Sequence, residues 1–102
     1  MGYFAVIREA GTSWMPGGII GQQGLDDHAA FMGQLADEGF AIAAGPLAGS
    51  EQDRLRALVI VTAEDEGQIH SRLAEDPWTR SRQLRITSIE AWKLFVGGER
   101  LG

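Results

Sequence analysis

Two short segments of this chain, residues 3–8 and 55–61, are apolar on both of the faces that a β-strand presents. In the first segment, Tyr3, Ala5 and Ile7 alternate with Phe4 and Val6. Successive side chains of a strand point to opposite faces of the sheet, so both faces of these strands would carry apolar groups. Such a sheet needs cover on both sides. This requirement constrains the fold more than any other feature of the sequence.

Helical periodicity predicts one layer of that cover. A first helix is expected over residues 26–38, with Asp26 and Asp27 as its cap and its favourable N-terminal charge. Phe31, Met32 and Leu35 form its buried stripe. A second helix is expected to start at a capping box in residues 62–65 and to run to about residue 75, where a proline stops it.

The remaining segments predict strands and loops. Residues 40–47 read as a strand that ends in Gly45-Pro46, which breaks regular pairing, and residues 48–54 read as a hairpin loop. Residues 82–96 read as the last strand, with a bulge near residues 87–88 because Ile89 is out of phase with Leu84 and Ile86. Residues 11–24 contain too many glycines for a regular element and form a glycine-rich loop.

The resulting order is β-α-β-β-α-β, which is the ferredoxin-like α+β arrangement. Two helices cover one face of a four-stranded antiparallel sheet, and nothing left in the chain covers the other face. We therefore expect a homodimer. The 102 residues fit one domain, with residues 97–102 as a frayed tail.

Composition narrows the classes of function. The net charge is −5 and Lys93 is the only lysine, which argues against nucleic-acid or membrane partners. There are no cysteines, so thiol nucleophiles and zinc–thiolate sites are excluded. No signal peptide, membrane span, cofactor motif or convincing metal-ligand set is present, so we expect a cytoplasmic protein with no cofactor and no metal.

Four segments together resemble the YCII (YciI-like) family. They are the opening strand Tyr-Phe-Ala-Val-Ile-Arg, Asp26-Asp27-His28, Ala44-Gly45-Pro46-Leu47 and Glu75-Asp76-Pro77-Trp78. The resemblance covers most of the chain and implies the dimeric α+β barrel fold, shared with muconolactone isomerase-like and antibiotic monooxygenase-like proteins. The chain departs from many relatives at Ala91, where they carry proline.

The resemblance implies that His28 and Asp76 form an active-site dyad and that Gly45 and Pro46 line the same cleft. One branch of the family is linked to dehydrochlorination of an aromatic catabolite. The long loop of residues 11–24 varies across the family, so the substrate preference of family members cannot be assigned to this chain.

Physical chemistry makes the dyad plausible. His28 falls at the start of one predicted helix and Asp76 at the end of the other, and antiparallel helices bring such ends together. A carboxylate that accepts the imidazole N–H fixes the tautomer and makes the other ring nitrogen a general base or acid. The alternative is structural: His28 makes a helix-start hydrogen bond, and Asp76 caps the turn before Pro77.

Other residues are weaker candidates for binding a substrate. Arg8 would hold a carboxylate, although a solvated edge arginine is the alternative. Trp14 and Trp78 would wall an aromatic ligand, or else pack in a core or interface. Gly45 would either admit a ligand or adopt a backbone angle that only glycine tolerates. His70 reads as a surface residue of the second helix.

These candidates support several hypotheses. The leading one is a small, cofactor-independent enzyme that performs an isomerisation or elimination with His28 and Asp76. The main alternative is a non-catalytic small-molecule binding or accessory module. A purely structural interaction domain and a cofactor-free oxygenase remain as further alternatives.

Overall fold

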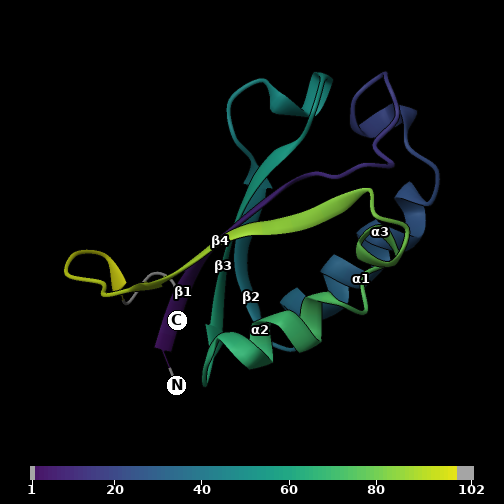
Figure 1. Ribbon diagram of the computed structural model, residues 1–102. Helices are drawn as coiled ribbons and strands as arrows, with labels where there is room; N and C mark the ends of the chain where they lie inside the picture. The colour runs from purple at the N-terminus through teal and green to yellow at the C-terminus, as the bar shows by residue number, and fades with distance from the viewer. Residues whose placement is uncertain (1, 99–102) are drawn as a thin grey trace.

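The computed structural model describes residues 2–98, and it contains four strands and three helices within that range. Figure 1 labels them. Their bounds are β1 (Gly2–Ala10), α1 (Leu25–Asp37), β2 (Ala41–Pro46), β3 (Arg56–Ala63), α2 (Glu66–Leu73), α3 (Pro77–Arg80) and β4 (Leu84–Trp92), with 3₁₀ turns η1 (Ile19–Gly21) and η2 (Ser50–Gln52). Most of the expected tail, residues 99–102, lies outside the described residues.

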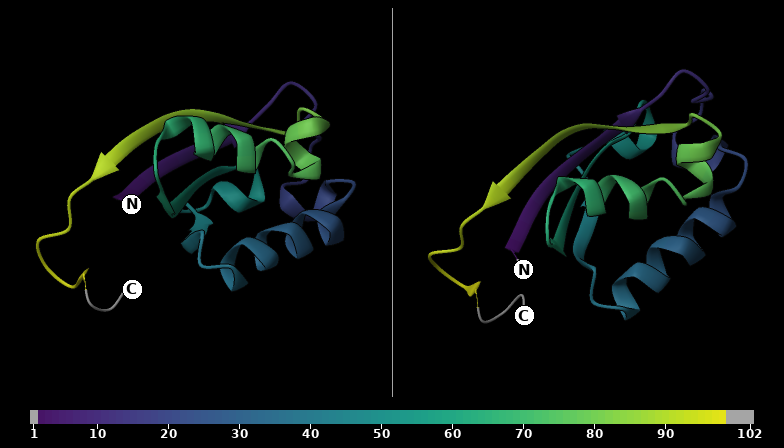
Figure 2. Two further views of the ribbon diagram at one scale, coloured as in Figure 1. Left: turned by 90° about the horizontal axis from the view of Figure 1, so that it is seen from below. Right: turned by 60° about the horizontal axis from the view of Figure 1, so that its bottom comes forward.

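The sheet is antiparallel with strand order β2-β3-β1-β4, and the three helices lie on one of its faces (Figure 2). Val6, Val59 and Val61 project from β1 and β3 toward the helices and pack with Leu35 of α1 and Leu73 of α2. The ferredoxin-like α+β fold expected from the sequence is confirmed.

The opposite face of the sheet is also apolar. Ile7 pairs with Leu58 across β1 and β3, and Tyr3 and Ala5 lie on the same side of β1. These four side chains are only half-buried. No helix within residues 2–98 covers this face (Figure 2), so any second layer must come from outside the described part of the chain.

The expected bulge in the last strand is confirmed. Ile7 pairs with Ser88 and Arg8 with Ile86, which leaves Thr87 as an extra residue in β4. Because of this extra residue, Ile89 pairs with Val6 and points to the helix-covered face, as Ile86 does before the bulge.

The helix starts differ from the sequence expectation. The N-cap of α1 is Gly24, in a left-handed conformation with φ of 78°, and no side chain caps the helix. Asp26 and Asp27 therefore supply charge in the first turn but no cap. The N-cap of α2 is Asp65, whose carboxylate accepts from the backbone N–H of Gln68 at 2.8 Å. Thr62 belongs to β3, since it pairs with Tyr3.

Two prolines also behave differently from the expectation. Helix α2 ends at Leu73, and Pro77 is the first residue of the separate short helix α3. Proline suits that position because the first helical N–H has no partner within the helix. Strand β2 ends at Pro46 as expected, but Pro46 itself still pairs with Ala57 at the edge of the sheet.

Candidate active site

His28 and Asp76 are brought together at the junction of α1 and α3. His28 lies in the first turn of α1, and Asp76 is the N-cap of α3. The ring Nδ1 of His28 lies 3.0 Å from Oδ1 and 2.9 Å from Oδ2 of Asp76. Because a carboxylate accepts, the neutral ring donates its Nδ1–H, and Nε2 is left as the nitrogen that can meet a ligand.

Asp76 is fully buried and accepts from two further donors. Arg8 Nη2 lies 2.9 Å from Oδ2, and the backbone N–H of Trp78 donates to Oδ1 at 2.9 Å. Burial acts to raise the pKa of Asp76, but the hydrogen bond from His28 and the charge of Arg8 outweigh it and hold the pKa below the usual range. The carboxylate is thus ionised near neutral pH.

Arg8 is a buried residue, and its interpretation as a solvated edge arginine is wrong. It projects from β1 onto the helix-covered face and is 1% exposed. Its Nη2 also donates to Thr79 Oγ1 at 2.8 Å, and its Nη1 lies 3.8 Å from the sulfur of Met32. Burial lowers the pKa of Arg8, and the neighbouring Asp76 carboxylate opposes that shift. Arg8 therefore balances the charge of Asp76.

The two candidate tryptophans form a support behind the histidine. The rings of His28 and Trp78 are stacked, with centroids 3.9 Å apart and planes at 8°. Trp14 packs edge-on against Trp78 at 5.6 Å. Trp78 Nε1 donates to the carbonyl of Gln23, and Trp14 Nε1 to that of Asp53, so both rings are anchored. This packing fixes the plane of the imidazole.

A cavity of about 210 Å³ opens beside His28, between α1 and the sheet. Gly45, Pro46, Arg8 and His28 lie in its wall, which brings four of the predicted site residues together. Trp14 and Trp78 are not among the lining residues. The remaining lining residues are Ile19, Met32, Ala44, Leu55, Ala57, Val59 and Leu84.

Gly45 does not require a backbone angle special to glycine. Its φ is not positive, and a Cβ built on it would meet no atom within 4 Å. Gly45 pairs with Leu58, so a Cβ there would point to the open face of the sheet, and Gly45 lines the cavity with its backbone alone. A special backbone angle is therefore not the reason for this glycine, and its role in admitting a ligand stays a prediction.

Sequence reasoning did not single out Met32, Ile19 or Thr79 as site residues. Met32 lies four residues after His28 and thus on the same side of α1, a spacing that indicates proximity. Thr79 and Ile19 lie in a one-turn helix and in a loop turn, where no periodicity reveals the neighbours of a side chain. Within residues 2–98, no group of three His, Asp or Glu side chains gathers as a metal site.

Comparison with solved structures shows a protein that this chain resembles over most of its length. The solved structure of 5-chloro-2-hydroxyhydroquinone dehydrochlorinase (TftG) from Burkholderia phenoliruptrix AC1100, in complex with 2,5-dihydroxybenzoquinone, matches 91% of this chain and 95% of its own. The TM-score is 0.64 and the sequence identity 25%. No family model matches the chain, and no curated protein gives a significant match.

The likeness supports the dimeric α+β barrel superfamily as the setting of this fold. Its narrower assignment to the YCII family stays a prediction from the sequence motifs. None of the helices in the described residues is long and apolar enough to cross a membrane.

Proposed function

We propose that this chain is a YCII-like, cofactor-independent enzyme that carries out an isomerisation or elimination on a small metabolite in the cytoplasm. One observation carries the proposal. His28 lines a cavity while its Nδ1 is held at 2.9 Å by a fully buried carboxylate. This is the arrangement that a general base requires, since the inner nitrogen is fixed and the outer one is available.

Each residue of the site has a distinct role in this proposal. Nε2 of His28 takes a proton from a C–H bond of the substrate or, for a chlorinated hydroquinone, from a ring O–H of its keto tautomer, and the electrons of that bond form a C=C or C=O double bond. In an elimination, the leaving group departs with the electrons of its own bond. Asp76 stabilises the imidazolium that forms. Arg8 keeps Asp76 ionised, and Trp78 holds the ring in place. General base catalysis of this kind contributes about 10²–10⁴ in rate.

The solved relative supports an elimination in particular. The printed name of that protein describes a dehydrochlorinase, and its structure holds a hydroxylated quinone. The cavity beside His28 has apolar walls from Ile19, Met32 and Leu55, which suit a flat aromatic or quinoid ligand. We extend the proposal to a substrate of that kind.

The alternative is a non-catalytic binding module that uses the same cavity. The cavity, at about 210 Å³, is smaller than the range of about 300–1,000 Å³ that is typical of ligand pockets, so either function would be limited to a small ligand. This alternative predicts that ligands bind without being converted.

The test measures chloride release from 5-chloro-2-hydroxyhydroquinone, and binding of 2,5-dihydroxybenzoquinone from the rise in melting temperature. We expect wild type to release chloride and the His28→Gln variant to be slower by about 10²–10⁴. The Gln34→Ala variant, altered at an exposed position of α1, serves as the control. Circular dichroism verifies that each variant is folded.

The other outcomes discriminate between the hypotheses. Binding of the quinone without chloride release supports the binding module. Equal turnover in wild type and His28→Gln contradicts the role of His28. If the protein neither binds the quinone nor converts the chlorinated substrate, the proposed aromatic substrate class is wrong.

A further inference from the structure

Arg8 has more hydrogen-bond donors than its protein partners use. A guanidinium carries five N–H bonds. Nη2 donates to Asp76 at 2.9 Å and to Thr79 at 2.8 Å. Within residues 2–98, Nη1 meets only the sulfur of Met32, at 3.8 Å, and the buried Nε has no hydrogen-bond partner. A thioether is a weak acceptor, and an unpaired donor in a protein interior is costly. Arg8 can therefore serve a further acceptor.

The guanidinium lies at the wall of the cavity beside His28. Arg8, His28 and Met32 all line this cavity, and the contact with the sulfur of Met32 indicates that Nη1 is on the cavity side. Among the lining residues of the described chain, Arg8 and His28 are the two with ionisable side chains, and the others are apolar or glycine. A ligand in this cavity thus meets one fixed cation and one base.

Asp76 links these two polar residues of the wall. Arg8 Nη2 and His28 Nδ1 each lie 2.9 Å from the same carboxylate oxygen, Oδ2. The ionised carboxylate offsets the positive charge of Arg8. A ligand with a negative charge at Arg8 is therefore attracted by the guanidinium and repelled by Asp76, so removing the charge of Asp76 should strengthen its binding.

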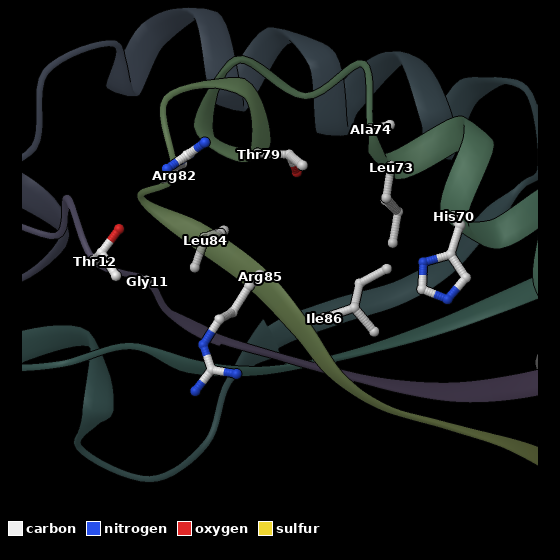
Figure 3. A pocket seen from close by; sticks show the side chains of 10 residues that line it. All are labelled: Gly11, Thr12, His70, Leu73, Ala74, Thr79, Arg82, Leu84, Arg85 and Ile86. Carbon is white, nitrogen blue, oxygen red and sulfur yellow. The ribbon is translucent and has the colours of Figure 1, made fainter.

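A second cavity, of about 560 Å³, lies between β4 and the helices α2 and α3 (Figure 3). Its two arginines do not converge on one ligand. Arg85 alternates with Leu84 and Ile86 along β4 and pairs with Glu9, so its side chain points to the opposite face of the sheet. Arg82 is exposed. The buried Arg8 is therefore the stronger candidate for holding an anion.

We propose that Arg8 binds an anionic oxygen of the ligand in the cavity beside His28. The proposal rests on the proposed function, because it takes this cavity as the substrate site. The oxygen replaces the sulfur of Met32 as the acceptor at Nη1, and the flexible methionine side chain moves aside. A charge-assisted hydrogen bond to oxygen is far stronger than a contact with a thioether.

This contact defines the class of ligand. It is a small acid or enol whose negative charge sits on oxygen, as in a carboxylate, an enolate or a phenolate. In the proposed reaction, the same contact stabilises the negative charge that is left on a substrate oxygen when His28 removes a proton.

The test measures binding of benzoate, and of its uncharged counterpart benzamide, by calorimetry at alkaline pH, where imidazole is neutral. We expect benzoate to bind more tightly than benzamide. Arg8→Gln lowers the affinity for benzoate about tenfold, the loss expected for one charge-assisted hydrogen bond. Arg82→Gln removes the same charge at an exposed position and leaves the affinity unchanged. Ala57→Leu abolishes binding, because Ala57 lines the cavity and pairs with Arg8 across β1 and β3.

Asp76→Asn separates a binding role of Arg8 from a structural one. Because it removes the negative charge beside Arg8, we expect benzoate to bind more tightly than it does to wild type. An Arg8 that acts only by holding Asp76 in place predicts that Asp76→Asn and Arg8→Gln both weaken binding. Circular dichroism verifies that each variant is folded, and the comparison of benzoate with benzamide in wild type needs neither variant.

Binding of benzoate also distinguishes this proposal from the catalytic one. We expect His28→Gln to keep its affinity for benzoate, because Arg8 holds the anion. If benzoate binds through Arg8 but no substrate is converted, the proposed reaction fails and the role of Arg8 stands. The role of Arg8 is overturned if benzoate does not bind at millimolar concentration, if benzamide binds equally well, or if Asp76→Asn weakens binding as Arg8→Gln does. It is also overturned if Arg82→Gln, and not Arg8→Gln, weakens binding.

Discussion

Asp76 connects three elements through a single side chain. Its carboxylate accepts from Arg8 of β1, from His28 of α1 and from the first turn of α3 at Trp78. A buried carboxylate is tolerated only when such donors satisfy it. The same contacts that make it acceptable in the core also orient the imidazole, so the structural role of Asp76 and its proposed catalytic role rest on one set of contacts.

The lowered pKa of Asp76 predicts how the stability of the protein depends on pH. Its pKa is lower in the folded protein than in the unfolded chain, so the unfolded chain binds more protons. Its contribution is fully present above about pH 4, the ordinary value for aspartate, and is lost as the pH falls through the folded pKa. We expect the free energy of unfolding of wild type to fall more steeply below about pH 5 than that of Asp76→Asn.

The measurement is urea denaturation at a series of pH values. Near neutral pH, Asp76→Asn should be less stable by about 3 kcal/mol, because Arg8 loses its buried partner. Asp37→Asn, altered at an exposed position at the end of α1, is the control and should follow wild type. Parallel pH curves for wild type and Asp76→Asn would show that Asp76 has no depressed pKa.

The sequence leads to part of this site. His28, Asp76, Gly45 and Pro46 were identified through short motifs, and the structure places them around one cavity or in contact. The burial of Arg8 was missed, although the period of two in β1 places it on the same face as Phe4 and Val6. Its partners Asp76 and Thr79 could not be foreseen, because they belong to α3 and its N-cap, and the sequence did not predict that helix.

At the scale of elements, the loop of residues 11–24 is held against the β2–β3 hairpin. Gly18, just before η1, adopts a φ of 68°, and a Cβ there would lie 2.4 Å from the carbonyl oxygen of Glu51 in η2. Trp14 donates to the backbone of Asp53 in the same hairpin. These contacts hold the loop in place, so Ile19 lines the cavity beside His28 from a fixed position.

Two glycine-to-alanine changes test this arrangement as a matched pair. Gly33 lies inside α1, where a Cβ would meet no atom within 4 Å, so Gly33→Ala should stabilise the protein by about 1 kcal/mol. Gly18→Ala should destabilise it, because the added carbon clashes with backbone and the φ is unfavourable. Urea denaturation of both variants gives the comparison, and a stable Gly18→Ala would mean that the loop is not anchored here.

Periodicity predicted the type and order of the elements, but it did not predict how they begin and end. The apolar stripe in α1 and the alternation of side chains in β1 follow directly from which residues are buried. They can therefore be recognised in the sequence. Whether Asp26 or Gly24 caps α1 depends on where the preceding loop runs, which is a tertiary property. Likewise, a proline such as Pro77 can follow the end of one helix or begin the next. Here it begins α3, because Asp76 caps the N-terminus of that helix.

At the scale of the whole molecule, the sheet has one covered and one open face. Ile7, Leu58, Tyr3 and Ala5 lie on the open face and are half-buried in the single chain. We propose that a second copy of the chain covers this face, as the apolar pattern of the two central strands already indicated. The homodimer would bury both sheets against each other.

The molar mass in solution, measured by light scattering during size-exclusion chromatography, tests whether the protein is a dimer. We expect a mass of about 22 kDa for wild type, twice the 11.0 kDa of the chain. Leu58→Lys should shift the protein to the monomer, because it places a charge in the proposed interface. Gln34→Lys adds the same charge on the exposed side of α1 and should leave the dimer intact. A wild-type protein of 11.0 kDa would refute this assembly.

The central claim is that Asp76 fixes His28 with its proton on Nδ1 and leaves Nε2 free for chemistry. Nitrogen NMR of the two imidazole rings at alkaline pH, where imidazole is neutral, tests it directly. His70, assigned with a His70→Gln variant, is the internal reference. We predict that His28 carries its proton on Nδ1 in wild type and loses this preference in Asp76→Asn. A His28 ring with its proton on Nε2 in wild type would contradict the proposed base and the mechanism that rests on it.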